Sequence, residues 1–452
     1  MAPTVRSFSA AIEPLGLVAE YPEHYPGILE SVVPAAGASA GRGFDILPIS
    51  TGEYLRWSND AQLSGPQGPL AGGFLDALER WVSNLRTVRG SGDLPFYGGW
   101  FVYLGYELAG EIEPRLRLPR GADPIVALAI RAPAAWIRER TTMHAWLVCE
   151  AGHEHLLERF TEHVDALGEQ CPAAGAAIAM HEEPADLFLA AVRRALDYTA
   201  AGDVYQTNLS RCWRGESAAS VDPVAIYARL RRTNPSPFAA LVRHGDFAVI
   251  SSSPERLMTI RDGIVSTRPI AGTRPRGATP ADDAALVCAL LNNEKERAEH
   301  VMLIDLERND LGRICVGGTV SVDEYMIVES YAHVHHIVSN ITGRLRDGVS
   351  PVAALRAVFP GGTITGCPKV RCMQIIAELE GTGRGAYTGS IGYINRDGNC
   401  DFNILIRTIS VHACAVSLRA GAGIVADSNP VAELAETRAK AEGLLRALDG
   451  SA

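Results

Sequence analysis

The sequence contains no long apolar run and no paired cysteines. No stretch among its 452 residues approaches the roughly 18 apolar residues that a membrane-spanning helix needs, and the N-terminal MAPTVRSFSAAIEPLG lacks the apolar core of a secretory signal. The nine cysteines are scattered without a Cys-x-x-Cys spacing, which disfavours a zinc site or a disulfide framework. We therefore expect a cytoplasmic protein with reduced thiols and no membrane association.

An excess of positive charge is also missing. Lys and Arg number 42 against 52 Asp and Glu, so the formal net charge is −10. A chain this acidic has little long-range attraction for a nucleic-acid backbone or an anionic membrane. We expect no nucleic-acid partner, and an anionic substrate must be held by local cations, a metal ion or a helix N-terminus.

Several catalytic signatures are absent. The chain has no G-x-x-x-x-G-K-[ST] phosphate loop, no nucleophile elbow in a Ser-His-Asp order, and no G-x-G-x-x-G after a strand. It also lacks a G-x-C-x-G elbow of the glutaminase type. Nucleotide binding, serine hydrolysis and glutamine hydrolysis are therefore not expected of this chain.

Helix and strand signals become regular after about residue 184. The apolar spacing and capping residues predict helices at 184–201, after Asp222-Pro223, and at 280–308, 351–358, 368–380 and 430–448. Strands are expected over 238–268 with a hairpin turn at Asp262-Gly263, over 319–328 and 333–345, and as a meander over 389–425. The apolar run at 98–104 fits either a buried strand or a short core helix.

This mixture of long helices and consecutive hairpins favours an α+β layered sandwich over alternating βαβ units. The weaker signals before residue 180 suggest an N-terminal part, 1–180, and a catalytic part, 181–452, which we expect to form one intertwined unit.

Glycine-rich segments provide the first candidate binding elements. Gly361–Lys369 leads into a helix with Pro368 at its first position, so it is either a flexible loop with a helix cap or an anion site at a helix N-terminus. Gly421-Ala422-Gly423, which follows a predicted strand, is a weaker signal of the same kind.

Acidic residues gather on two predicted helices. The segment 294–300 contains three glutamates, and the last helix carries Glu433 and Glu436 with Lys440 one turn further on. Carboxylates from two facing helices can hold Mg²⁺, a hard cation that prefers oxygen ligands. The alternative is a solvated helix face, which is the commoner role of such residues.

Two further polar features lie on predicted strands. Arg407 lies in the otherwise apolar DFNILIRT, so its guanidinium requires either a buried ion pair or a ligand carboxylate. In YAHVHHIVS, strand alternation places His333 and His335 on one face and His336 on the other. A histidine in such a strand is more often a core residue than a catalyst.

Taken together, these segments resemble the chorismate-utilising enzymes, a family that contains anthranilate, aminodeoxychorismate, isochorismate and salicylate synthases. The resemblance is dense over 184–450, thin before it, and implies an anthranilate-synthase-like fold with a two-sheet β-sandwich flanked by helices. The matching motifs are GDVYQTNLS (202–210), NPSPF (234–238), SSSPERL (251–257), RPIAGTRPRG (268–277), RAEHVMLIDLERNDLGR (297–313), HVHHIVS (333–339), GGTITGCPKVRCMQIIAELE (361–380), GSIGY (389–393), IRT (406–408) and AGAGIVADS with AETRAKA (420–441).

The resemblance implies roles for the metal and the reacting groups. Glu299 and Glu436 would hold Mg²⁺, which in turn holds the ring carboxylate of chorismate. Glu255 would be the general acid that protonates the departing C4 hydroxyl, for which a raised pKa is expected. His336 would lie against the reacting ring.

The resemblance also implies a set of substrate-binding residues. The enolpyruvyl carboxylate would be held by Arg407, Lys440 and the backbone amides of Gly421 and Gly423. The pocket would further be lined by Tyr387, Thr365 and Gly366.

Position 271 separates the branches of the family. Isochorismate and salicylate synthases, and one kind of aminodeoxychorismate synthase, carry a lysine where this chain has Ala271. An alanine can neither activate water nor form a covalent adduct, so ammonia is the expected nucleophile. HVHHIVS, GCPKVRCM and DFNILIRT favour the aminodeoxychorismate branch, whereas the P-I-A-G-T motif is shared with anthranilate synthases, which remain the alternative.

The resemblance also concerns partners and regulation. Since no glutaminase elbow is present, ammonia would come from a separate glutamine amidotransferase subunit. Ser31, Pro235 and Pro237 match the elements that enclose tryptophan in this family, which makes tryptophan a candidate ligand. A non-catalytic regulatory subunit is a minor alternative, disfavoured because the chain keeps Glu255 and Lys440 together with the other polar residues.

Overall fold

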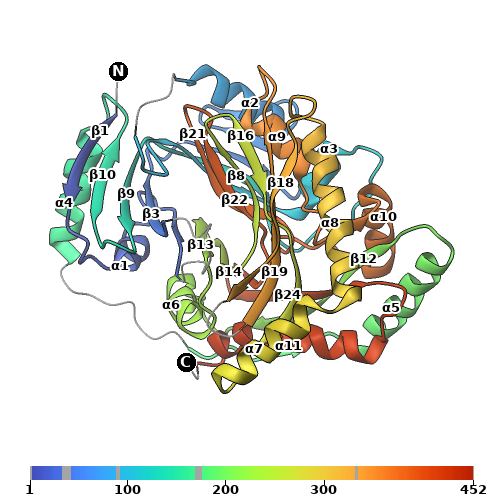
Figure 1. Ribbon diagram of the computed structural model, residues 1–452. Helices are drawn as coiled ribbons and strands as arrows, with labels where there is room; N and C mark the ends of the chain where they lie inside the picture. The colour runs from blue at the N-terminus through green and yellow to red at the C-terminus, as the bar shows by residue number, and fades with distance from the viewer. Residues whose placement is uncertain (1–2, 33–41, 88–91, 168–175, 331–333, 451–452) are drawn as a thin grey trace.

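Two antiparallel sheets form the centre of the molecule. The computed structural model describes residues 3–32, 42–87, 92–167, 176–330 and 334–450. Helices cover the outer faces of the sheets (Figure 1). This arrangement confirms the expected α+β fold with a two-sheet sandwich flanked by helices.

The first sheet contains twelve strands: β1 (Thr4–Phe8), β2 (Gly27–Glu30), β3 (Phe44–Ile49), β9 (Ala134–Glu139), β10 (Ala145–Cys149), β11 (Met180–Glu182), β12 (Gln206–Glu216), β13 (Phe238–His244), β14 (Phe247–Ser253), β20 (Gly366–Cys367), β23 (Thr408–His412) and β24 (Ala415–Ile424). They lie in the order β1-β10-β9-β3-β2-β13-β14-β23-β24-β12-β11, and β20 pairs with β12.

The second sheet also contains twelve: β4 (Tyr54–Ser58), β5 (Leu63–Gly65), β6 (Gly68–Leu70), β7 (Gly99–Leu104), β8 (Ile125–Ala132), β15 (Arg256–Arg261), β16 (Ile264–Thr267), β17 (Ile270–Pro275), β18 (Ser321–Ser330), β19 (Val334–Arg344), β21 (Ser390–Asn395) and β22 (Cys400–Asn403). Their order is β17-β19-β16-β15-β22-β21-β7-β8-β4-β5-β6, with β18 paired to β19. Both sheets therefore combine strands from before and after residue 180.

The helices are α1 (Pro14–Glu20), α2 (Phe74–Asn84), the short 3-10 helix η1 (Tyr106–Leu108), α3 (Ala109–Ile112), α4 (His155–Leu167), α5 (Ala185–Ala200), α6 (Pro223–Thr233), α7 (Pro280–Leu291), α8 (Glu294–Gly312), α9 (Pro351–Val358), α10 (Lys369–Glu380) and α11 (Pro430–Leu448). Proline in the first turn and a polar cap define the start of five of them, where the caps are Glu13, Asp222, Thr279, Ser350 and Asn429.

Apolar contacts hold four layers together: helices, the second sheet, the first sheet and a further layer of helices. Between the sheets, Phe101 and Ile130 belong to one core cluster with Val242 and Val249. On the outer face of the second sheet lie α2, α8 and α9, and on that of the first lie α1, α4, α6 and α11. Because successive side chains of a strand point to opposite faces, one strand contributes to both cores. Leu241 packs in the core between the first sheet and its helices, and Val242 packs in the core between the two sheets.

Two expectations about elements were wrong. The helix expected over 280–308 is two helices, because Asn293 adopts an extended conformation and its side chain accepts a hydrogen bond from the amide of Glu296, which begins α8. The meander expected over 389–425 is divided, since β21 and β22 belong to the second sheet and β23 and β24 to the first. The run at 98–104 contains a strand, β7, and His333 lies outside the described residues.

Candidate active site

Glu255 lies in the link between β14 and β15, which belong to different sheets. Its side chain is buried and accepts a hydrogen bond of 2.7 Å from the Thr363 hydroxyl at Oε1. Burial raises the pKa of Glu255 to about 7, although Thr363, Lys440 and Arg407 favour the ionised form. The carboxyl group therefore keeps its proton near neutral pH, as a general acid must.

Arg407 lies in the corresponding link between β22 and β23. Its backbone has a positive φ of 52°, which is uncommon for a residue with a side chain, and its carbonyl accepts a hydrogen bond of 3.0 Å from the amide of Ser252. Burial lowers the pKa of Arg407, and the nearby charges that act on it are those of Tyr387, Glu436 and Glu255. Within the described residues its guanidinium forms no hydrogen bond or ion pair, so it is available for a ligand carboxylate.

Lys440 contributes a second cation. From α11 its Nζ donates a hydrogen bond of 3.0 Å to the carbonyl of Gly421 and lies 2.5 Å from Glu436 Oε1. The charges of Lys440 and Arg407 both act on Glu255. The structure thus brings together the acid and the two cations that the sequence suggested.

His336 lies on β19 and pairs with Thr273 of β17, the strand that also contains Ala271. Its Nδ1 lies 2.9 Å from the Thr273 hydroxyl, and burial lowers its pKa to about 4, so the ring is neutral at pH 7. Ala271 pairs with Ile337, and the register shifts after it, where Gly272 has a φ of 66°. The charges of Arg407 and Lys440 also reach His336, which places the ring at the same site.

Two glycines of β24 leave space on the sheet. A Cβ at Gly421 would lie 2.6 Å from the Tyr387 hydroxyl and 2.9 Å from Asn208 Oδ1, and one at Gly423 would lie 2.6 Å from Gln206 Nε2. Any side chain at either position would displace these groups. The glycines therefore allow polar atoms to lie directly over the strand, as a close approach of a ligand requires.

The segment 361–367 lies beside the same strands. Gly366 pairs with β12 at a φ of 129°, and a Cβ there would collide with the backbone carbonyl of Gln206. The Thr365 hydroxyl donates to the carbonyl of Gly361 at 2.8 Å, and the Thr365 backbone carbonyl accepts from the amide of Asn208 at 2.9 Å. Thr365 therefore shapes the loop that lines the site.

The expected metal residues lie on α8 and α11. Glu299 is partly exposed, and Glu436 is 48% exposed and pairs with Lys440. Among the described residues no three His, Cys, Asp or Glu side chains gather as a metal site. Two carboxylates are nevertheless sufficient for Mg²⁺, which usually takes one or two from the protein and completes its shell with water and substrate. The shared metal site stays a prediction.

The segments of the expected tryptophan pocket are adjacent. Strands β2 and β13 pair, and the amide of Val32 donates to the carbonyl of Ser236 at 3.0 Å. Ser31 therefore lies next to the loop that contains Pro235 and Pro237. Tryptophan binding stays a prediction.

Several polar residues around the site were not predicted from the sequence. Thr363 contacts the acid, Thr273 contacts His336, and Glu307 of α8 is a buried carboxyl whose pKa burial raises to about 8. The negative charge of Glu255 also raises the pKa of Glu307. A polar residue within an apolar stretch of sequence can indicate a buried polar side chain of this kind. Its contact partners become apparent only in the folded structure.

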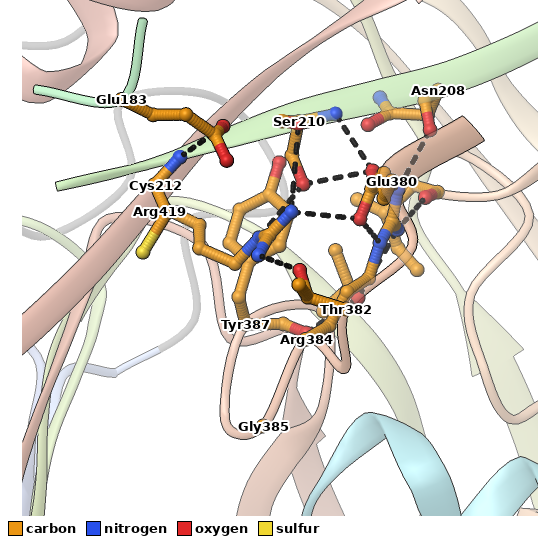
Figure 2. A network of polar contacts seen from close by, with 12 residues as sticks. Glu183, Asn208, Ser210, Cys212, Glu380, Thr382, Arg384, Gly385, Tyr387 and Arg419 are labelled. Atoms are coloured by element: carbon orange, nitrogen blue, oxygen red, sulfur yellow. Dashed lines mark hydrogen bonds and ion pairs between the residues drawn. The ribbon is translucent and has the colours of Figure 1, made fainter. Parts of the chain in front are cut away.

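A buried ionic network, shown in Figure 2, was also missed. Glu380 at the end of α10 pairs with Arg384 at 2.6 Å and with Arg419 at 2.9 Å, and it accepts a bond of 2.8 Å from the amide of Ser210. Tyr387 lies beside the network. The side chains of these three charged residues are almost completely buried.

A buried acid, two adjacent cations and an uncharged histidine define an enzyme of α+β fold that acts on a small anionic substrate. Comparison identifies the family: residues 55–446 match the family of chorismate binding enzymes. The chain belongs to this family.

Similar proteins have names from two branches of the family. An anthranilate synthase component I-like protein of Synechocystis sp. is 42% identical over 362 residues, which are 79% of this chain and 74% of that protein. Aminodeoxychorismate synthase component 1 of Bacillus subtilis is 42% identical over 390 residues, covering 83% and 82% of the two chains. The crystal structure of anthranilate synthase component I from Streptococcus pneumoniae superimposes with a TM-score of 0.80 at 31% identity, covering 91% and 93%.

The protein is therefore a chorismate-utilising enzyme. The two branches match it at equal identity, so similarity alone does not select the product. In the described part of the chain, no helix is long and apolar enough to cross a membrane.

Proposed function

We propose that the protein is aminodeoxychorismate synthase component I, which aminates chorismate to 4-amino-4-deoxychorismate. The buried acid Glu255 beside Arg407, whose guanidinium has no ion-pair partner among the described residues, is the observation that carries the proposal. The aminodeoxychorismate-like motifs around His336 and Arg407 and the Bacillus subtilis relative support the choice of branch.

The reaction replaces a C–O bond by a C–N bond. Arg407 and Lys440 hold the enolpyruvyl carboxylate, and the Glu255 proton passes to the C4 hydroxyl, which leaves as water. Ammonia supplies the electron pair for the new C4–N bond and then loses a proton, which returns Glu255 to its acid form, while neutral His336 contacts the ring. Ala271 offers no amine, so no covalent enzyme adduct forms and water is not activated there.

We propose Glu299 and Glu436 as the Mg²⁺ ligands. Their hard oxygen donors fit this cation, and Mg²⁺ bound there would neutralise the ring carboxylate of the substrate. Ammonia would come from a separate glutamine amidotransferase subunit, because the chain lacks a glutaminase elbow.

Product analysis tests the proposal. The purified protein receives chorismate, Mg²⁺ and ammonium, and the products are examined for anthranilate fluorescence and, after addition of a lyase, for 4-aminobenzoate. Formation of 4-aminobenzoate supports the proposal. Anthranilate without 4-aminobenzoate identifies the alternative branch, and absence of chorismate consumption identifies a regulatory subunit.

A second candidate, anthranilate synthase component I, is favoured by the P-I-A-G-T sequence around Ala271 and by the equal identity of the Synechocystis relative. The adjacency of Ser31 to the 234–238 segment also suits tryptophan feedback, which is a property of that branch. The same product analysis distinguishes the two.

A further inference from the structure

The network around Glu380 satisfies its carboxylate from three sides. Oε1 accepts from the Ser210 amide at 2.8 Å, the Ser210 hydroxyl at 2.9 Å and Arg384 Nη2 at 2.6 Å, while Oε2 accepts from Arg384 Nε at 3.1 Å and Arg419 Nη2 at 2.9 Å. Figure 2 shows the two guanidinium groups on either side of the carboxylate. Arg384 therefore forms the forked, two-bond pair that arginine alone can make.

Arg384 also connects the segments that carry the expected substrate-binding residues. Its Nη2 donates to the carbonyl of Asn208 on β12 at 2.7 Å, and its Nη1 donates to the carbonyl of Ile364, next to Thr365, at 3.2 Å. Its guanidinium carbon lies 5.6 Å from the ring centre of Tyr387. One side chain thus holds the strand, the loop and the tyrosine in place.

Arg419 extends the network to the glycine strand. It lies two residues before Gly421 on β24, and its Nε donates to the Ser210 hydroxyl at 3.0 Å. Strand pairing places Ser210 opposite Gly421 and Asn208 opposite Gly423, so these residues share one face of the sheet.

This face has an unpaired acceptor. Asn208 is 8% exposed, and its side-chain Oδ1 is buried and lacks a hydrogen-bond partner among the described residues. It lies against Gly421 together with the Tyr387 hydroxyl. A buried amide without a partner is costly and indicates a face prepared for a ligand.

We propose that Arg384 is a positioning residue for substrate binding, which fixes the face formed by Asn208, Gly421 and Tyr387 through its pair with Glu380. The proposal rests on the chorismate site described above. Arg384 supports the residues of this face and has no role in proton transfer. Its loss therefore weakens the binding of the substrate and of the transition state to the same extent. Such a loss raises KM and leaves kcat nearly unchanged.

The test is Arg384→Lys, which keeps the positive charge but removes the fork and the planar stacking surface. We expect KM for chorismate to rise by about 10- to 100-fold, the size associated with a small displacement of binding groups, while kcat changes by less than about threefold. Chorismate consumption with Mg²⁺ and saturating ammonium is followed in both proteins.

Arg131→Lys is the matched control. Arg131 is equally buried, pairs with Glu150 at 2.5 Å and lies over Trp100 at 5.1 Å, but it contacts none of the residues of the proposed site. We expect a comparable loss of thermal stability with an unchanged KM. This separates a general loss of stability from a specific loss of positioning.

An unchanged KM in folded Arg384→Lys overturns the proposal, as does an equal rise of KM in the Arg131 control. If Arg384→Lys does not fold, Glu380→Gln provides the measurement, because it removes the carboxylate with which Arg384 pairs, and an unchanged KM in that folded variant overturns the proposal equally. The wild-type rate separates this proposal from the proposed function: turnover in the wild type with an unchanged KM in the variant refutes only the role of Arg384.

Discussion

The raised pKa of Glu255 predicts that Glu255→Gln gives a protein that is far less active than the wild type but more stable at alkaline pH. The folded protein keeps the proton to about pH 7, whereas the unfolded chain releases it near 4.5. Folding therefore becomes less favourable as the pH rises through this window, because the unfolded state can ionise and the folded state cannot. Below pH 4.5 both states are protonated and the effect vanishes.

The size of the effect follows from the two pKa values. Each pKa unit corresponds to about 1.36 kcal/mol, so the native carboxyl costs about 3 kcal/mol of unfolding free energy at pH 8 and less than about 1 kcal/mol at pH 5. The glutamine is neutral at every pH and avoids this cost. It has no proton to donate, so kcat falls by about 10²- to 10⁴-fold.

Urea unfolding at pH 5 and pH 8, followed by fluorescence, measures the difference between variant and wild type. Glu442→Gln is the control, because this glutamate is 59% exposed and pairs with Arg446 at the surface. The difference in unfolding free energy between this control and the wild type should not increase from pH 5 to pH 8. A Glu255→Gln variant whose added stability is the same at both pH values would refute the buried, protonated acid.

Four further outcomes are expected. At constant free ammonia, kcat/KM of the wild type falls above about pH 7 as Glu255 ionises, and a flat profile up to pH 9 would contradict its role as the acid. Glu299→Ala and Glu436→Ala abolish Mg²⁺-dependent turnover, measured by chorismate consumption over a Mg²⁺ titration; full activity in either removes that residue from the metal site. Arg407→Gln raises KM for chorismate by about tenfold or more, the loss associated with a charge-assisted hydrogen bond, and an unchanged KM would show that it does not bind the carboxylate. Calorimetry with millimolar tryptophan, on protein freed of the amino acid, shows binding heat if the segment around Ser31 encloses it; no heat removes that site.

The local sequence determined most of the helices and several strands. The caps and prolines at Asp222 and Asn429 define the starts of α6 and α11, and the turn at Asp262-Gly263 gives the hairpin, because these effects depend on neighbours within a few residues. The residue at position 271 likewise excludes an amine by its chemistry alone. The ordered motifs were sufficient to identify the family.

The tertiary structure decided what depends on distant segments. The meander is divided because the chain crosses from one sheet to the other around Arg407, which the alternation of residues does not reveal. The pKa of Glu255 depends on desolvation by packed elements, and the bond between Glu380 and Ser210 joins residues 170 positions apart. Spacing along the chain contains no information about such contacts, whereas burial in the folded protein gives them their strength.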